Sequence, residues 1–413
     1  MRIVYLHQYF NTPDMAGGTR SYEIGRRLVA AGHQVDLVTS WQEPTESKDW
    51  FATDVAGMRV HWLPVRYSNH MSYRMRIGAF LKFSLKASIY VRHMKADVVL
   101  ATSTPLTIAL PGALGARHLR VPMVFEIRDL WPELPIVMGA IRNPVVRWGA
   151  RKLEDFAYSN AAQIIALSPG IAAGVARTGY PSKKIHVVPN GSDLDLFKRD
   201  AFLGDAFRME AGIPKEKILV GYAGTLGRIN GVAYLAKLAA QLKDDQRFAF
   251  IVIGDGQERG DIEALAKSLS ILGRNFFMLP KLAKAKMPAA FSAFDVATSL
   301  FLPIPEMESN SANKFFDALA SGCCVAINYG GWHADLLQQS VAGFRLATNI
   351  PQAATQLQVL MSDKQQLAVF GRNARRLAEE QFSRNKQASS VDAILRNVVG
   401  CAKTQQSDSG MAR

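Results

Sequence analysis

The sequence is poor in the residues that build disulfide frameworks and metal sites. Its 413 residues include three cysteines; Cys323 and Cys324 are neighbours, and Cys401 stands far from both. This spacing fits neither a disulfide framework nor a metal site. The eight histidines form no H-x-x-x-H or similar pair, which argues against zinc. We therefore expect a reducing, cytosolic compartment and no bound metal.

Long apolar stretches are also missing. No run of about 18 apolar residues occurs, so no segment is expected to span a bilayer. The amino terminus, "MRIVYLHQYF", lacks the long apolar core and the small-residue cleavage site of a signal peptide. We expect a cytoplasmic protein on this basis.

Acidic residues are absent from one long segment, Arg66–Lys95. The chain has a formal net charge of +14, and this segment alone carries seven lysines and arginines. Its apolar residues recur at helical spacing: Ile77, Phe80, Leu81, Leu85 and Ile89. A basic amphipathic helix suits an anionic membrane surface, although its apolar face could also pack on its own domain. No recognised nucleic-acid module accompanies the charge, so nucleic acid is not an expected partner.

Short apolar runs alternate with helix-like segments along most of the chain. The first series is Ile3–Leu6, Val35–Thr39, Val98–Ala101, Met123–Glu126 and Ile164–Ala166; the second is Leu219–Ala223, Phe248–Ile253, Phe276–Leu279, Val296–Leu300 and Val325–Asn328. Such alternation predicts an α/β protein with two Rossmann-like parallel-sheet domains. We place the domains at 1–197 and 198–385. A last helix, about Lys386 to Val399, could return to the first domain, and the polar tail to 413 is expected to be disordered.

Ligands of parallel sheets bind beyond the carboxyl ends of the strands, so we expect the ligand-binding residues in the loops that follow the strands. Gly17 and Gly18 follow the first predicted strand and precede a helix, where glycine lets a phosphate or sugar approach free amides. A plain turn explains them equally well. Glu126 and Arg128 follow the strand that begins at Met123. Charges there are costly unless they are paired or used, and we favour a function over a surface pair of Arg128 with Asp129.

Two loops of the second half show a similar design. Gly227 precedes Arg228, a cation that could meet developing leaving-group charge, and Gly254 and Gly256 follow the next strand. Together with the first loop, these glycines predict a nucleotide or diphosphate ligand.

A further segment of the second half places Glu308 before a helix that carries Lys314 and Asp317 on one face. A carboxylate can hold a ribose diol and a lysine can meet a phosphate, although an ordinary ion pair is the alternative. The acidic motif Asp193–Asp195 lies in the interdomain turn, and we interpret it as structural.

The order of these motifs resembles a known family. The segments "MAGGTR", "EIRDLWPE", "IIALSPG", "VVPNGSDLDLF", "YAGTLGRINGV", "VIGDGQER" and "NKFFDALASG" are similar to those of GT-B glycosyltransferases of family 4, over roughly residues 1 to 385. "RDLWPE" looks most like the branch that includes bacterial L-fucosamine (N-acetylfucosamine) transferases of surface polysaccharide assembly. The resemblance implies two domains facing a central cleft, and a retaining, metal-independent transfer from a nucleotide-sugar.

The resemblance also implies roles for single residues. Arg228, with Lys314, would stabilise the departing diphosphate, and Gly17 and Gly18 would face the donor across the cleft. Gly254 to Gly256 would lie near the nucleotide, and Asp317 would hold the ribose. Three positions depart from the family pattern: Asn230 replaces a frequent lysine, Ser309 the first acid of E-x7-E, and Arg128 a frequent histidine.

These observations predict an enzyme that moves a sugar, an N-acetylated deoxyhexosamine or hexosamine, from a UDP-sugar to a lipid-linked saccharide. The acceptor would sit on a polyprenyl diphosphate, with the protein peripheral on the inner face of the cell membrane. Two alternatives stay open. One is a UDP-sugar 2-epimerase, which would need acids and histidines for proton transfer. The other is a non-catalytic nucleotide-sugar-binding subunit, which the departures at Asn230 and Ser309 leave possible.

Overall fold

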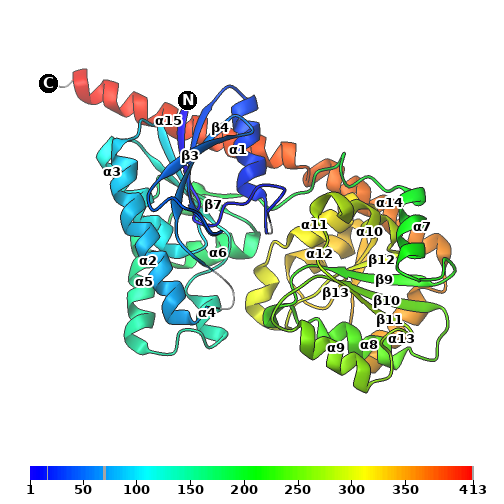
Figure 1. Cartoon of the computed structure of the whole chain (residues 1–413). Coiled ribbons are helices and arrows are strands. Elements are labelled where there is room, and N and C mark those ends of the chain that lie inside the picture. Colours follow the sequence, from blue (N-terminus) through cyan, green and yellow to red (C-terminus); the bar gives the residue numbers. More distant parts are fainter. Residues whose placement is uncertain (16, 68–70, 412–413) are drawn as a thin grey trace. The chain divides into compact units, whose positions relative to one another are not determined.

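The chain folds into two compact units, each built around one sheet (Figure 1). The computed structural model describes residues 1–15, 17–67 and 71–411; Ala16, within the "MAGGTR" motif, and residues 68–70 of the basic segment lie outside this description. The side chains of Tyr73, Arg74, Lys364, Lys403 and residues 405–411 are likewise not described. Unit 1 comprises residues 1–189 and 385–413, and unit 2 comprises residues 190–384.

Unit 1 contains an eight-stranded sheet in the order β3-β4-β2-β1-β5-β6-β7-β8. Only the β3–β4 pair is antiparallel among the pairings described. The strands are β1 Arg2–Leu6, β2 Gln34–Trp41, β3 Phe51–Val55, β4 Met58–Pro64, β5 Val98–Thr102, β6 Met123–Ile127, β7 Gln163–Ala166 and β8 Ile185–Val187. The helices are α1 Arg20–Ala30, α2 Tyr73–Tyr90, α3 Ala109–Leu119, α4 Glu133–Val137, α5 Pro144–Ser159, α6 Pro169–Arg177 and α15 Arg384–Met411.

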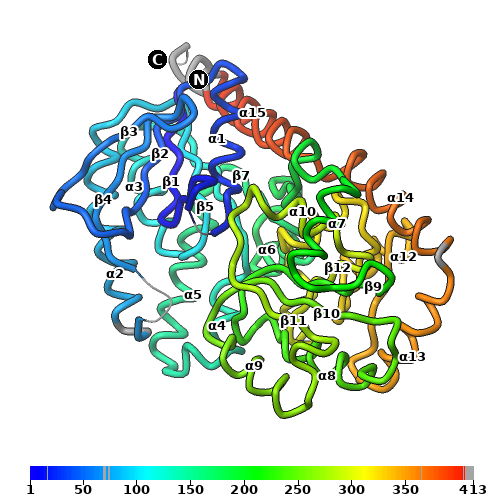
Figure 2. The backbone as a smooth tube through the Cα atoms, turned by 45° about the vertical axis from the view of Figure 1, so that its right-hand side comes forward, coloured from blue at the N-terminus to red at the C-terminus, as the bar shows by residue number. Residues whose placement is uncertain are grey.

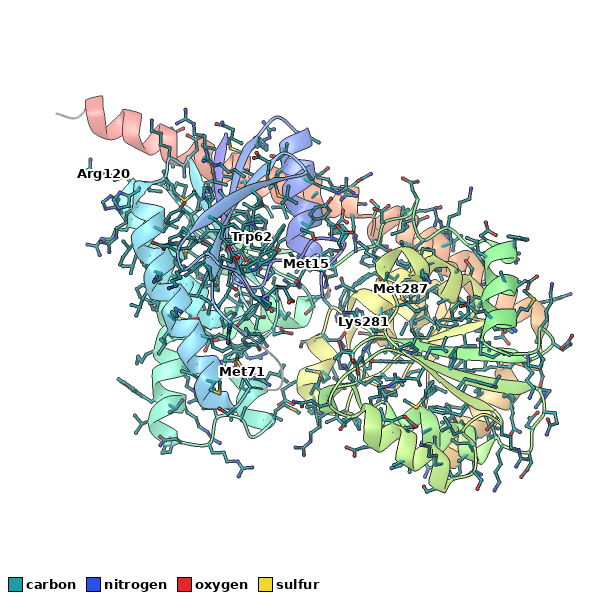
Figure 3. All side chains as sticks on the ribbon, viewed as in Figure 1. Met15, Trp62, Met71, Arg120, Lys281 and Met287 are labelled. Atoms are coloured by element: carbon teal, nitrogen blue, oxygen red, sulfur yellow. The ribbon has the colours of Figure 1, made fainter. Side chains whose placement is uncertain are left out.

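Both faces of this sheet are covered, because alternate strand residues point to opposite sides. Ile3 and Tyr5 join the core beneath α1 and α15, whereas Val4 and Leu6 join the core beneath α2 and α3. Figure 2 shows α15 beside α1, although the two are far apart in the sequence. Figure 3 shows Trp62 among the side chains inside this unit, where it is buried.

Unit 2 contains a six-stranded parallel sheet in the order β11-β10-β9-β12-β13-β14. The strands are β9 Ile218–Ala223, β10 Phe248–Ile253, β11 Phe276–Leu279, β12 Val296–Ser299, β13 Cys324–Ile327 and β14 Gly343–Arg345. The helices are α7 Ala201–Glu210, α8 Ala233–Gln241, α9 Arg259–Ser268, α10 Met287–Ala293, α11 Asn313–Ala320, α12 Trp332–Ser340, α13 Ile350–Leu360 and α14 Lys364–Gln381. In Figure 1, α8 and α9 lie on one side of the sheet and α10 and α11 on the other.

The fold class is therefore confirmed: two α/β units with parallel sheets. The boundary differs from the sequence prediction by eight residues, since the chain enters unit 2 at Asn190 rather than near Phe197. Asn190 donates to the carbonyl of Ser311, and Phe197 is buried in a core of unit 2, so both belong to that unit. The last helix groups with unit 1, and it runs to Met411 rather than ending near Val399. A polar sequence can extend a helix that packing has already nucleated.

Candidate active site

In unit 1 the loops after β1, β5 and β6 lie at one edge of the sheet, because these strands are neighbours and parallel. Glu126, near the end of β6, is 1% exposed and forms an ion pair with Arg20 of α1, at 2.9 Å. Its second oxygen accepts from the Thr102 hydroxyl at 2.6 Å. Burial works against ionisation of Glu126, but Arg20 and these hydrogen bonds outweigh it and lower its pKa.

Arg20 also reaches the end of unit 1. Its guanidinium donates to the carbonyls of Val188 and Pro189, the last residues of unit 1 before the chain enters unit 2. A buried pair with these extra hydrogen bonds is costly to break from one side. Glu126, predicted as a catalytic carboxylate, thus has both oxygens engaged and holds Arg20 in place.

Arg128 is oriented by two contacts at the same edge. Its backbone amide donates to the Ser103 hydroxyl, and its guanidinium lies 3.3 Å from Nε2 of His7. Burial, and secondarily the charge of Arg128, hold the pKa of His7 well below its usual range. His7 is therefore neutral, and it accepts from Arg128 at Nε2, which puts its proton on Nδ1. That Nδ1 is buried and has no hydrogen-bond partner within the described residues.

Gly17 makes a close approach within its own loop. Its φ is +138°, and a Cβ there would lie 2.5 Å from Nδ2 of Asn11. The glycine therefore lets the loop after β1 fold back before α1 begins. Gly18 follows it and precedes Thr19, the residue before α1. The role predicted for Gly17 and Gly18 toward a donor stays a prediction.

In unit 2 the glycine loops after β9 and β10 pack against each other. A Cβ on Gly254 would lie 1.9 Å from the carbonyl oxygen of Gly224, and a Cβ on Gly256 would lie 2.5 Å from that of Leu226. The amide of Leu226 also donates to the carbonyl of Asp255. Glycine is thus required here for contact between two backbones, at the carboxyl ends of two adjacent strands.

Lys314 of α11 reaches this same edge. Its ammonium lies 4.8 Å from the ring centre of Tyr222 and 4.4 Å from that of Phe301, and it donates to the Tyr222 hydroxyl at 3.2 Å. A Cβ on Gly224 would lie 3.6 Å from the Lys314 side chain. Burial lowers the pKa of Lys314 to about 7. No ion pair joins Lys314 to a carboxylate within the described residues, Asp317 included.

The loop between β9 and α8 presents Arg228 to solvent. Gly227 precedes the short helical turn Arg228–Asn230, and Arg228 is exposed. Asn230 is buried, and its side chain donates to the Thr225 carbonyl at 3.0 Å. The residue that stands where the family often has lysine therefore closes its own loop. Arg228 and Lys314 are two cations at this edge, and a third, Arg259, donates to the carbonyls of Gly254 and Leu279.

Asp317 and Glu308 lie apart from Lys314 in their contacts. Asp317 accepts from the Ser192 hydroxyl at 2.7 Å; burial raises its pKa, against the lowering effects of Arg384 and of that hydrogen bond. Glu308 lies over the turn at Gly330, where a Cβ would come within 2.6 Å of its Oε1. The ordinary ion pair of Lys314 with Asp317, the alternative that the sequence left open, is not formed: Lys314 contacts Tyr222, and Asp317 contacts the segment that enters unit 2.

Three functional candidates were missed by the sequence reasoning: His7, Arg20 and Tyr222. His7 directly follows a predicted strand, so the same strand-end rule would have found it. Tyr222 lies within a predicted strand, but the sequence does not indicate that Lys314 contacts it. Arg20 meets a partner 106 residues away, which no local pattern reveals.

Within residues 1–15, 17–67 and 71–411, no cluster of three or more His, Cys, Asp or Glu side chains could hold a metal ion. No described helix is both long and apolar enough to cross a bilayer.

Two sheets whose carboxyl edges carry these loops define a two-domain glycosyltransferase architecture, the GT-B fold. A family model described as "Glycosyl transferase 4-like domain" matches residues 16–191, and one described as "Glycosyl transferases group 1" matches residues 205–377. The chain therefore belongs to the glycosyltransferases. This confirms the glycosyltransferase resemblance; the fucosamine-transferase branch stays a prediction.

Individual relatives agree with this family. The chain is 29% identical to the putative glycosyltransferase EpsF of Bacillus subtilis over 32% of this chain and 34% of that protein. It is 22% identical to the putative colanic acid biosynthesis glycosyl transferase WcaI of Escherichia coli over 65% of this chain and 69% of that protein. The first relative is thus matched over about a third of its length. The structure of HepE from Anabaena in complex with UDP-glucose shares the fold, with a TM-score of 0.72, 18% identity and coverage of 96% and 100%.

Proposed function

We propose that the protein is a retaining glycosyltransferase of family 4 that transfers a sugar from a UDP-sugar to a lipid-linked saccharide in bacterial surface polysaccharide assembly. The sugar is an N-acetylated deoxyhexosamine or hexosamine, and the transfer needs no metal. The names of EpsF, WcaI and the HepE complex support this proposal, since they concern glycosyl transfer, colanic acid biosynthesis and UDP-glucose respectively.

The observation that carries the proposal is the environment of Lys314. A half-buried lysine over two aromatic rings, with no carboxylate partner within the described residues, favours an anionic ligand. It lies beside the glycine loops of β9 and β10, whose backbones allow close approach. A nucleoside diphosphate bound there would receive Lys314 and the exposed Arg228 as its two cations.

These residues suit a transfer in which the leaving group is a diphosphate. As the bond from the sugar C1 to the diphosphate breaks, negative charge grows on the leaving oxygen, and the two cations stabilise that charge. The acceptor hydroxyl attacks C1 from the same face and passes its proton to an oxygen of the departing diphosphate. Such a step retains the configuration and needs no nucleophile or metal from the enzyme.

The surface of α2 supports a lipid-linked acceptor. The predicted apolar stripe is exposed at Ile77, Leu81, Leu85 and Ile89, by 47%, 46%, 65% and 61%, and Lys82 and Lys86 are exposed beside it. The opposite face, which includes Phe83 and Ala87, packs into the core of unit 1. These four side chains are therefore not needed for packing, whereas Phe80 of the predicted stripe packs against Tyr9 and Tyr67. With the lysines beside them, the four suit an anionic membrane surface.

Thermal unfolding with excess UDP, GDP, ADP or NAD tests the proposal. A ligand at about 100 times its dissociation constant stabilises the protein by roughly 2.7 kcal/mol. We expect UDP alone to raise the melting temperature. Stabilisation by NAD alone would contradict the nucleotide-sugar function.

A second assay separates transfer from its alternatives. Radiolabelled UDP-sugars are supplied with polyprenyl diphosphate saccharides, and the lipid fraction is counted. Label in the lipid supports transfer. Conversion of UDP-N-acetylglucosamine to its 2-epimer without acceptor indicates the epimerase. UDP binding without turnover on any donor indicates a binding subunit.

A further inference from the structure

A groove of about 860 Å³ lies in unit 2, away from the loops described above. Its lining includes Ile218, the first residue of β9, Asp295, which precedes β12, and Cys324, the first residue of β13. The groove therefore lies at the amino ends of these parallel strands. The candidate donor loops follow the carboxyl ends of the same sheet, so the two places are at opposite edges.

The groove is strongly basic. Seven lysines and arginines line it against three acids, Glu216, Asp295 and Glu379. Two of these acids are already neutralised: Asp295 lies 2.7 Å from Arg208, and Glu379 lies 2.6 Å from Arg375. A volume of this size falls in the range of small-molecule sites, and the excess of cations selects anionic ligands.

Two of the arginines hold the frame of the groove. Arg375 donates to the carbonyls of Leu194, Phe197 and Ala320, and Arg199 donates to those of Phe294 and Gly322. Helix α14 also lies directly on the turn after α11, because a Cβ on Gly371 would come within 2.4 Å of the Gly322 carbonyl oxygen. The walls are thus fixed by arginine side chains bound to backbone carbonyls and by the close approach of α14 to the turn after α11.

Of the other five cations, Lys215 is paired with Asp205, and the remaining four have no such structural task. Lys198 and Arg372 are exposed, Lys217 is half-buried, and no ion pair is found for any of the three within the described residues. Arg376, also exposed, donates only to the Asn373 side chain among described groups. These four side chains come from three separate segments that the fold brings to one groove.

We propose that this groove binds a small ligand that carries two or more linked phosphate groups. Lysine meets phosphate as a point charge and arginine as a two-pronged donor, so cations spread along a groove match a chain of phosphates better than a single anion. The ligand is a nucleoside triphosphate or a free polyphosphate. The site is independent of the proposed transfer, because it shares no residue with the donor loops.

Calorimetric titration of the full chain with inorganic triphosphate, ATP and inorganic phosphate tests this site, with and without saturating UDP. Sodium chloride of matched ionic strength controls for screening. The test variant is Arg372→Ala/Arg376→Ala, in which alanine favours the helix. The control is Lys237→Ala/Lys243→Ala, which removes the same charge from exposed positions elsewhere in unit 2.

We expect triphosphate to bind with UDP present, more tightly than phosphate, and to lose at least tenfold in affinity in the test variant only. Tighter binding of ATP than of triphosphate would identify a nucleotide as the ligand, and equal binding would identify a polyphosphate chain. Equal affinity in the test and control variants would overturn the site, as would no triphosphate binding. Triphosphate binding in the groove without any binding of UDP would contradict only the proposed function. Unchanged circular dichroism shows that each variant is folded.

Discussion

The charged side chains at the carboxyl edges of the two sheets differ in whether they have partners. In unit 1, Glu126 is paired with Arg20, and Arg128 donates to neutral His7. In unit 2, Lys314 and Arg228 have no carboxylate within ion-pair distance among the described residues. The charges at the first edge are thus largely paired within the chain, whereas the second edge has two cations without a carboxylate partner among the described residues.

Under the proposed function, this difference separates charges that build the fold from charges available to a substrate. A buried pair satisfied by its own chain contributes to a fixed geometry, and its removal costs stability. A buried cation without a partner costs stability in the free protein and gains it back when an anion binds. Substitution at the first edge should therefore change the free energy of unfolding, and substitution at the second should change turnover or ligand affinity.

Breaking the Glu126–Arg20 pair of unit 1 should have the largest effect. Glu126→Gln leaves Arg20 buried without its counter-charge, and we expect a loss of about 3–5 kcal/mol in the free energy of unfolding. Urea denaturation followed by tryptophan fluorescence measures this, since five of the six tryptophans lie in unit 1 (Trp41, Trp50, Trp62, Trp131 and Trp148).

The matched control for that variant is Asp155→Asn, which breaks the exposed pair with Lys152 in the same unit. It should cost less than about 1 kcal/mol. Equal destabilisation by the two substitutions would show that Glu126 does not hold unit 1 together, and it would return Glu126 to the list of catalytic candidates.

Removing Arg228, a cation of unit 2 without a carboxylate partner among the described residues, should change turnover rather than stability. For Arg228→Ala we expect transfer to fall about 100- to 1000-fold, because one donor to the leaving group is lost. Unfolding should change by less than about 0.5 kcal/mol, since Arg228 is exposed. Arg274→Ala, an exposed arginine of the same unit paired with Asp244, is the control and should keep full activity. Retention of turnover by Arg228→Ala would remove it from the active site.

The pKa of Lys314 predicts how UDP affinity depends on pH. In the free protein burial holds this pKa at about 7, so above pH 7 the neutral Lys314 amine must take up a proton to meet the diphosphate as an ammonium. The dissociation constant for UDP should therefore rise by up to about tenfold per pH unit between pH 7 and 9. In Lys314→Met, calorimetry should find weaker binding and a nearly flat profile. Parallel profiles for the two proteins would show that Lys314 does not face the ligand.

Stability without UDP should change with pH in the opposite sense. The pKa of an unfolded lysine is about 10.4, so between pH 7 and 10 the unfolded chain binds the proton that the folded chain has released. The free energy of unfolding of the wild type should thus rise with pH over this window, relative to Lys314→Met. Chemical denaturation at pH 7, 8 and 9 measures the difference.

The sequence predicted most of the fold because buried parallel strands are nearly continuous apolar runs. All ten runs correspond to strands, whereas β3, β4, β8 and β14 were not predicted. β3 is largely exposed, and β8 and β14 have three residues each at sheet edges. These three edge strands lack the length or the apolar pattern that marks a strand. The same reason does not apply to β4, which has seven residues, is mostly buried and lies inside the sheet.

The candidate site was predictable only in part, for a similar reason. Strand ends follow from the apolar runs, so the loops of Gly17, Gly227 and Gly254 could be located. Partners could not, because they depend on strand order and on helix placement. Thus Glu126 meets Arg20 across the sheet, and Lys314 turns toward Tyr222 rather than Asp317.

The comparison extends to the outer surface of unit 1, where α2 exposes apolar side chains beside Lys82 and Lys86, the latter 4.0 Å from a carboxylate oxygen of Asp49. For Leu85→Gln/Ile89→Gln we expect binding to vesicles with anionic lipids to weaken about tenfold, because less apolar area enters the interface. Vesicle co-sedimentation measures this. Met209→Gln/Val359→Gln, at two apolar positions of unit 2 that are 79% and 67% exposed, is the control and should bind like the wild type.

The same experiment in neutral vesicles decides what the lysines contribute. Lys82 and Lys86 are exposed beside the stripe, and a cation near an anionic surface is worth roughly 1 kcal/mol. Lys82→Gln/Lys86→Gln should therefore weaken binding to anionic vesicles and leave the weaker binding to neutral vesicles unchanged. If neither the apolar nor the basic substitutions change vesicle binding, α2 is not the membrane contact. The exposed charges of unit 1 would then differ from those of unit 2 in having no ligand at all.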